Sequence, residues 1–151
     1  MADECTHKRI AVSNEMTMGR LLDPNVTGGV ASPSDHPWIV IMAYYSVYHL
    51  VEEIAAITDP NIHMADHDEQ VVFLRKIPVL RDVVVLYNNL NSLRKYALYR
   101  PLANVSFRTE QQILGYANVD LFQSVVLGDC FGTIKDKLAA YRRSLLSVKA
   151  S

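Results

Sequence analysis

The stretch Pro37-Trp-Ile-Val-Ile-Met-Ala-Tyr-Tyr-Ser-Val-Tyr-His49-Leu-Val-Glu52-Glu53-Ile-Ala-Ala-Ile57 decides the fold class. It is long and strongly apolar, Ser34 or Asp35 before it suits a helix N-cap, and Pro37 fits the first turn. We expect one helix over this stretch, ending at the Asp59-Pro60 pair. Since so apolar a helix belongs in a core, the polar residues in its second half need a reason.

The rest of the chain shows helical rather than strand periodicity. Residues 7–22 carry a weak helical pattern, residues 65–76 run into Pro78, and residues 79–99 show a clear 3.6-residue period. From 109 to 148 the pattern is helical again, with Gly128 or Gly132 marking a break before a last helix over 133–147. The sequence therefore predicts a single all-α domain over residues 1–151, an up-and-down bundle of four to five helices with a flexible loop near 23–34.

Composition excludes a broad electrostatic field. The 151 residues include 15 Lys and Arg against 16 Asp and Glu, so a nucleic-acid role has to rest on a local patch. Cys5 and Cys130 show no pair spacing, which suits reduced thiols in a cytosolic compartment. The N-terminus has no apolar signal region, and the longest apolar run, residues 38–48, is short of the roughly 20 residues of a membrane span. We expect a cytoplasmic protein without a membrane segment.

Helical spacing gathers polar residues on two faces. Residues three, four and seven apart share a face, which places Tyr45, His49 and Glu53 together on one helix, and Tyr87 and Arg94 together on another. On a functional interpretation, His49 and Arg94 point toward one another at a pocket rimmed by Tyr45 and Tyr87. On a structural interpretation, His49 donates to Glu53 or a backbone carbonyl, and Arg94 pairs with a carboxylate of the bundle. Both interpretations stay open from the residues alone.

The segment His63-Met-Ala-Asp66-His67-Asp68-Glu69 carries a second signal. Two histidines four apart beside carboxylates can bind a divalent metal, but Met64 stands where a zinc protease has its general base. The acidic residues equally suit the first turn of a helix, where they complement the helix dipole. The sequence favours a helix boundary with one histidine, His67, facing the site, and no metal.

Basic and aromatic residues alternate in Arg94-Lys-Tyr-Ala-Leu-Tyr-Arg100. Such a patch can bind phosphate through Lys95 and Arg100 and stack bases on its rings, although cations in a last helical turn also favour the helix dipole. The chain has no Gly-rich phosphate loop, Cys-x-x-Cys or Ser nucleophile elbow, so we expect no cofactor and no covalent catalyst.

Taken together, Ala43-Tyr-Tyr-Ser-Val-Tyr-His49-Leu-Val-Glu52, His63-x-x-x-His67 and Tyr87-x-x-Leu90-x-x-Leu93-Arg94-x-Tyr96 resemble the HEPN superfamily over roughly residues 35–100. That resemblance implies an α-helical bundle of toxin–antitoxin and defence systems, commonly dimeric. Catalytic members combine an Arg, four to six variable residues and a His to cleave RNA through the ribose 2′-hydroxyl. Here Arg94 lies in the expected helix, but no histidine follows residue 67.

Three functions follow as expectations. The first is a non-catalytic HEPN-like module that binds a nucleotide, RNA or a cognate partner protein, with Tyr45, His49, Glu53, His67, Tyr87 and Arg94 lining a polar pocket. The second is a metal-independent endoribonuclease in which His49 or His67 serves Arg94 as a displaced acid/base. The third is a structural protein whose apolar helix pairs two copies of the chain as a homodimer. The missing histidine favours the first.

Overall fold

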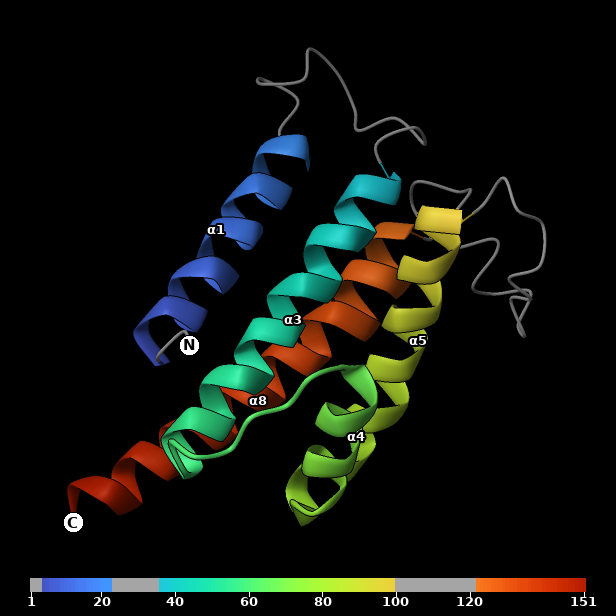
Figure 1. Ribbon diagram of the computed structural model, residues 1–151. Coiled ribbons are helices and arrows are strands. Elements are labelled where there is room, and N and C mark those ends of the chain that lie inside the picture. Colours follow the sequence, from blue (N-terminus) through green and yellow to red (C-terminus); the bar gives the residue numbers. More distant parts are fainter. Residues whose placement is uncertain (1–3, 23–35, 100–121) are drawn as a thin grey trace.

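The computed structural model describes residues 4–22, 36–99 and 122–151, and within these ranges every regular element is a helix (Figure 1). This confirms the all-α prediction. The two helix N-cap candidates, Ser34 and Asp35, lie outside the described residues. So do Arg100 and the predicted loop near 23–34.

Four long helices run side by side, each antiparallel to the next along the chain (Figure 1). Central α3 contacts all three of the others. A shorter helix and a 3-10 turn close one end, and a π-helix leads into the last long helix. The bounds are α1 Glu4–Leu22, α3 His36–Thr58, α4 His67–Arg75, η1 Pro78–Leu80, α5 Arg81–Tyr99, η3 Phe122–Gly132 and α8 Thr133–Ala150.

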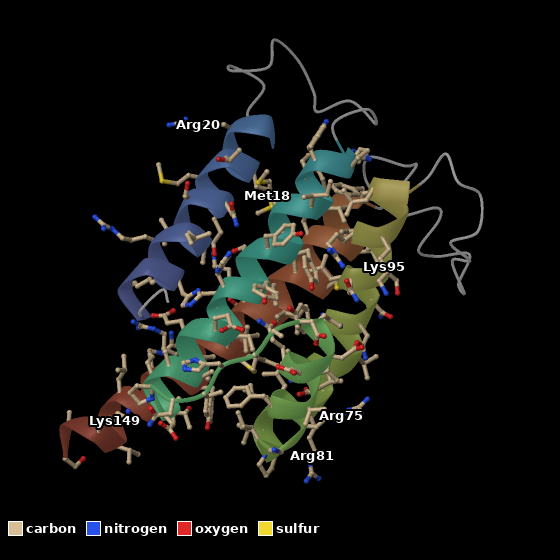
Figure 2. All side chains as sticks on the ribbon, in the orientation of Figure 1. Met18, Arg20, Arg75, Arg81, Lys95 and Lys149 are labelled. Carbon is tan, nitrogen blue, oxygen red and sulfur yellow. The ribbon has the colours of Figure 1, made fainter. Side chains whose placement is uncertain are left out.

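The core lies around α3, as its apolar sequence predicts. Ile39, Val40, Ala43, Val47 and Val51 are buried, each with 0% of its surface exposed. By length and composition alone α3 could also cross a membrane, but 56% of its apolar window is buried inside the fold, as in a core helix. That makes it weak evidence for a span. Met18 of α1 turns inward to this core, while Arg20, Arg75, Arg81 and Lys149 project outward (Figure 2).

Helix α4 begins where its acidic residues predict. The Asp66 carboxylate caps the helix by accepting from the backbone N–H of Glu69 at 3.0 Å, and the Glu69 carboxylate accepts from the backbone N–H of Ala65 at 2.7 Å. Pro78 prevents the helix from continuing and opens the 3-10 turn η1. This reciprocal cap fixes His67 as the first residue of α4.

Helix α5 presents the predicted apolar stripe to the core. Val83, Tyr87, Leu90 and Leu93 are buried, but Leu98 near the end of the helix is 43% exposed. The helix begins at Arg81 rather than Val79, because the 3-10 turn takes up the residues after Pro78.

The predicted break falls at Gly132, where the π-helix η3 gives way to α8. A Cβ atom on Gly132 would lie 3.0 Å from the carbonyl oxygen of Leu127, so the wide turn favours glycine there. The Cys130 thiol donates to the carbonyl of Leu86 at 3.2 Å, and burial raises its pKa to about 12. Cys130 thus packs in the core as a free thiol, and its raised pKa favours the protonated form at neutral pH. The Cys5 side chain lies outside the described residues.

Candidate functional site

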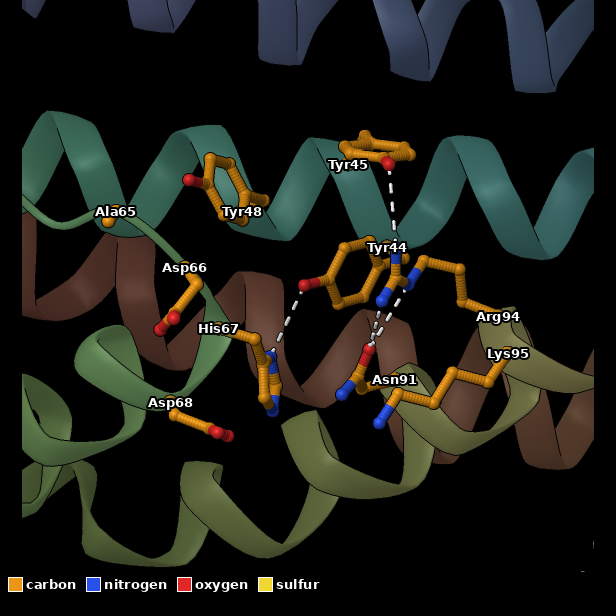
Figure 3. Close-up of a pocket in the computed structure, with 10 residues that line it drawn as sticks. All are labelled: Tyr44, Tyr45, Tyr48, Ala65, Asp66, His67, Asp68, Asn91, Arg94 and Lys95. Atoms are coloured by element: carbon orange, nitrogen blue, oxygen red, sulfur yellow. Dashed lines mark hydrogen bonds between the residues drawn. The ribbon is translucent and has the colours of Figure 1, made fainter. Parts of the chain in front are cut away.

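A cavity of about 380 Å³ opens between α3, α5 and the start of α4 (Figure 3). We call it the Arg94 cavity. Its wall combines three tyrosines, two cations, two carboxylates, an imidazole and an amide. The lining residues are Tyr44, Tyr45, Tyr48, Ala65, Asp66, His67, Asp68, Asn91, Arg94 and Lys95.

Arg94 is held on the α5 side by neutral partners. Its Nε and Nη2 atoms donate to Asn91 Oδ1 at 3.1 and 2.8 Å, and Nη1 donates weakly to the Tyr45 hydroxyl at 3.5 Å (Figure 3). The guanidinium carbon lies 4.3 Å from the centre of the Tyr44 ring and 5.9 Å from that of Tyr45, within cation–π range. Within residues 4–22, 36–99 and 122–151, Arg94 forms no ion pair with a carboxylate. Its charge therefore faces the cavity without an ion-paired carboxylate among these residues.

His67 forms the floor, with both ring nitrogens engaged. Nε2 lies 2.9 Å from Asn88 Oδ1, an acceptor, so Nε2 carries the proton and Nδ1 accepts from the Tyr44 hydroxyl at 3.3 Å. Burial lowers the pKa of His67, and the neighbouring cations Arg94 and Lys95 lower it further, against the opposing effects of Asn88 and Asp68. His67 is therefore neutral at pH 7, with Asn88, His67 and Tyr44 in one hydrogen-bonded line.

A buried network beneath the floor ties the three helices together. The Tyr87 hydroxyl donates to Gln70 Oε1 at 2.5 Å, while Gln70 Nε2 donates to the Tyr48 carbonyl at 3.1 Å and to Glu52 Oε1 at 2.7 Å. The Tyr87 ring stacks on Tyr44 with 5.6 Å between ring centres, and burial raises the pKa of both phenols. The floor is rigid because its polar atoms are satisfied within the protein.

Charges of opposite sign occupy opposite sides of the cavity. Arg94 and Lys95 come from α5, while Asp66 and Asp68 come from the start of α4 (Figure 3). Lys95 and Asp68 are exposed, and neither pairs with another described residue. The site thus offers a cationic side and an anionic side, with aromatic rings along its third wall.

The structure gathers only some of the predicted site residues. Tyr45, His67, Arg94 and Lys95 line the cavity, as expected. Tyr87, expected at the rim, lies fully buried beneath the floor.

The expectation that His49 faces Arg94 is wrong. His49 Nδ1 lies 3.0 Å from Nδ1 of His7 on α1, and the two rings stack with 5.3 Å between centres. A helix turns by about 100° per residue, so His49 is about 140° around α3 from Tyr44, the ring on which Arg94 lies. Helix α1 covers the His49 side, and α5 covers the Tyr44 side.

Glu53 also lies away from the cavity. Its carboxylate is 1% exposed and accepts from Nε of Arg142 on α8 at 2.6 Å. Glu53 therefore has a structural role, as on the structural interpretation, but its partner is Arg142 rather than His49. The structural interpretation offered Glu53 or a backbone carbonyl as the partner of His49, but His49 contacts His7 on α1 and Glu53 pairs with α8.

Sequence reasoning missed six of the ten lining residues: Tyr44, Tyr48, Ala65, Asp66, Asp68 and Asn91. Tyr44 and Tyr48 are four residues apart and so share a helix face, which is a signal that the sequence does contain. Asp66 and Asp68 were assigned to the first turn of a helix; Asp68 lies there and Asp66 is the N-cap just before it. The position of that turn against α5 is a tertiary feature.

Within the part of the chain that the structure describes, no three His, Cys, Asp or Glu side chains are placed to share a metal ion. His63 is exposed and lines a neighbouring hollow with Met64 and Phe73. That hollow shares Asp66 and Asp68 with the Arg94 cavity, but His67 does not line it.

No family model, curated protein or solved structure matches this chain. A functional proposal is therefore argued from the fold and the Arg94 cavity alone.

Proposed function

We propose that the protein is a non-catalytic binding module, HEPN-like in character, whose Arg94 cavity takes a nucleotide or one nucleotide unit of single-stranded RNA. One observation carries this proposal: the Arg94 guanidinium, stacked on Tyr44 and bonded only to neutral oxygens among the described residues, has no anionic partner. A partly buried cation held rigidly without a counter-charge is suited to an anion from outside the protein.

The other walls suit the rest of a nucleotide. Tyr45 is 38% exposed and lies 6.3 Å, centre to centre, from the ring of Tyr48, so both rings can stack with a base. Lys95 supplies a second cation for phosphate beside Arg94. A cavity of about 380 Å³ is near the lower end of small-molecule sites, which suits one nucleotide unit rather than a folded RNA surface.

Isothermal titration calorimetry with nucleoside 5′-monophosphates, and with the matching nucleosides, tests the proposal. We expect monophosphates to bind and nucleosides to bind much more weakly, with added salt weakening the monophosphates. Arg94→Gln should reduce affinity about tenfold or more, since a hydrogen bond to a charged group is worth roughly 1.5–3 kcal/mol.

Arg75→Gln is the matched control, because Arg75 is an exposed arginine outside the cavity. It should leave affinity unchanged. Absence of binding by every monophosphate at millimolar concentration would refute the proposal, and so would equal losses from the two arginine substitutions.

A second candidate, the endoribonuclease with a displaced histidine, is favoured by one observation: His67 and Arg94 line the same cavity. In that reaction the 2′-hydroxyl would give its proton to His67 Nδ1, and its oxygen would bond to phosphorus. The 5′-oxygen would leave with a proton from solvent. Binding remains the leading proposal because the Tyr44 hydroxyl already occupies Nδ1. RNA carrying 2′,3′-cyclic phosphate ends, lost in Arg94→Gln and in His67→Asn, would reverse that order.

The toxin–antitoxin or defence context, the cytoplasmic location, the cognate partner protein and the homodimer stay predictions. The third function, dimerisation through the apolar helix, has less to support it, because α3 buries its apolar residues within its own bundle. Sedimentation at micromolar concentration tests the homodimer directly.

A further inference from the structure

The cations and the carboxylates lie on opposite sides of the cavity, and this arrangement favours one nucleobase. Resting on the nucleotide-binding function proposed above, we infer that the Arg94 cavity selects guanine, with Asp68 accepting from the base while Arg94 and Lys95 hold the phosphate. The selection concerns a guanine nucleotide, whether free or within a single strand of RNA.

Asp68 is the carboxylate available for this role. Asp66 already accepts from the backbone N–H of Glu69 as the cap of α4, whereas Asp68 makes no hydrogen bond or ion pair with any other described residue. In Figure 3 the Asp68 side chain points toward the side that carries Lys95, while Asp66 points away from it. Lys95 faces Asp68 from the other side of His67, and the two form no salt bridge.

The space between these charges lies over His67. Arg94, Lys95 and Asp68 line the cavity together with His67, and Figure 3 shows the His67 ring between the Asp68 side chain and the Lys95 side chain. A ligand lying over His67 therefore meets cations at one end and a carboxylate at the other, with Tyr45 and Tyr48 along its length.

Only one common base offers a carboxylate two adjacent donors. The Watson–Crick edge of guanine presents N1–H and N2–H side by side, which can pair with both oxygens of one carboxylate. Adenine and cytosine each place an acceptor nitrogen beside their amino group, and uracil flanks its single N–H with two carbonyl oxygens. Those acceptors would lie against the Asp68 charge, so the carboxylate both attracts guanine and disfavours the other bases.

Calorimetric titrations of the whole protein with GMP, IMP, AMP and CMP test the inference. We expect GMP to bind at least about tenfold more tightly than AMP or CMP, as for a good bidentate contact. IMP keeps N1–H but lacks the 2-amino group, so it should be intermediate. The trinucleotides UGU and UAU repeat the comparison for a single strand, and whichever of GMP and UGU binds more tightly identifies the source of the guanine.

Two substitutions separate base recognition from phosphate binding. Asp68→Asn should abolish the preference, lowering GMP affinity and raising AMP affinity until the two are about equal, because the amide offers one acceptor oxygen in place of two and no longer repels the acceptor nitrogens of adenine. Asp136→Asn is the control, since Asp136 is an exposed aspartate in the first turn of α8 outside the cavity. It should leave the preference for guanine intact.

The outcomes are distinguishable from failure of the proposed function. Equal binding of GMP and AMP, weakened alike by Arg94→Gln, would overturn guanine selection and leave nucleotide binding standing. A preference for GMP that survives Asp68→Asn would overturn the role of Asp68. No binding by any of the four nucleotides would overturn both proposals.

Discussion

The two sides of α3 differ in whether their charged side chains form ion pairs. Toward α1 and α8, Glu53 is paired with Arg142 and Glu15 with Lys135, so each carboxylate has a cation. Toward α4 and α5, Arg94 has no carboxylate partner within the described residues, and Asp68 and Lys95 are unpaired. The side with paired charges belongs to the scaffold, and the side with unpaired charges carries the candidate site. Charge alone did not make that distinction in the sequence, because both sides contain arginine and glutamate or aspartate.

We call the side of α3 toward α1 and α8 the closed side and the side toward α4 and α5 the open side. The largest loss of stability should come from a substitution on the closed side. Arg142→Leu leaves the Glu53 carboxylate buried without this cation, and we expect the free energy of unfolding to fall by about 3 kcal/mol. Arg94→Leu, on the open side, should cost less than about 1 kcal/mol because its partners are neutral and can turn to water. Urea denaturation measures both.

The double substitution Glu53→Leu with Arg142→Leu is the control for the first prediction. It removes the stranded charge together with its partner, so most of the lost stability should return. If the single and double substitutions destabilise equally, the pair contributes through packing rather than charge.

The next largest loss of stability should come from a substitution in the floor of the Arg94 cavity. Tyr87→Phe removes the donor to Gln70 Oε1 and leaves that buried oxygen unsatisfied, which we expect to cost about 1–2 kcal/mol. Tyr141→Phe on α8 changes a half-buried phenol away from the cavity and should have little effect. An unfolding transition unchanged by Tyr87→Phe would show that the floor does not depend on this hydrogen bond.

Acid should weaken both sides of α3, by a smaller amount. Burial and then the neighbouring His7 lower the pKa of His49, and burial lowers that of His67. Since the unfolded chain binds these protons more readily, stability is complete above about pH 6.5 and falls as the pH drops toward the lowered pKa values. Denaturation from about pH 7.5 to about pH 5 measures this dependence.

Two variants test whether the histidine facing α1 contributes to the pH dependence of stability. His49→Asn removes the ring that faces α1 and should flatten part of the dependence, whereas His63→Asn changes an exposed ring and should not. A steeper dependence in His49→Asn would contradict the assigned direction of the pKa shift.

The smallest effect should come from the exposed ion pair of the closed side. The Lys135 and Glu15 side chains are 44% and 25% exposed, so Lys135→Ala should cost about 0.5 kcal/mol or less. High salt should remove most of that difference, since it screens the pair. A loss comparable to that of Arg142→Leu would mean that burial does not govern the strength of these pairs.

The sequence predicted the helices better than it predicted their neighbours. The 3.6-residue period over residues 79–99 predicted a helix with an apolar face, because helical periodicity is local. The sequence placed Tyr87 at a polar rim, although the structure buries it. It also placed His67 at the start of a helix. It did not show that α1 covers His49 or that Tyr44 faces Arg94, since helix packing depends on contacts between residues far apart in the chain. His49, the histidine of the apolar stretch, thus packs against α1 and lies outside the Arg94 cavity.

Gln70 makes the assembly of three helices observable in solution. Its side-chain oxygen accepts from α5, and its side-chain nitrogen donates to two oxygens of α3, while its backbone belongs to α4. Most glutamine amide protons exchange freely with water and give crowded NMR signals. Those of Gln70 should be separated from the rest and protected from exchange, so one resonance pair reports whether α3, α4 and α5 are docked. Following that pair during a titration would reveal whether a ligand tightens or loosens the bundle without labelling the site itself.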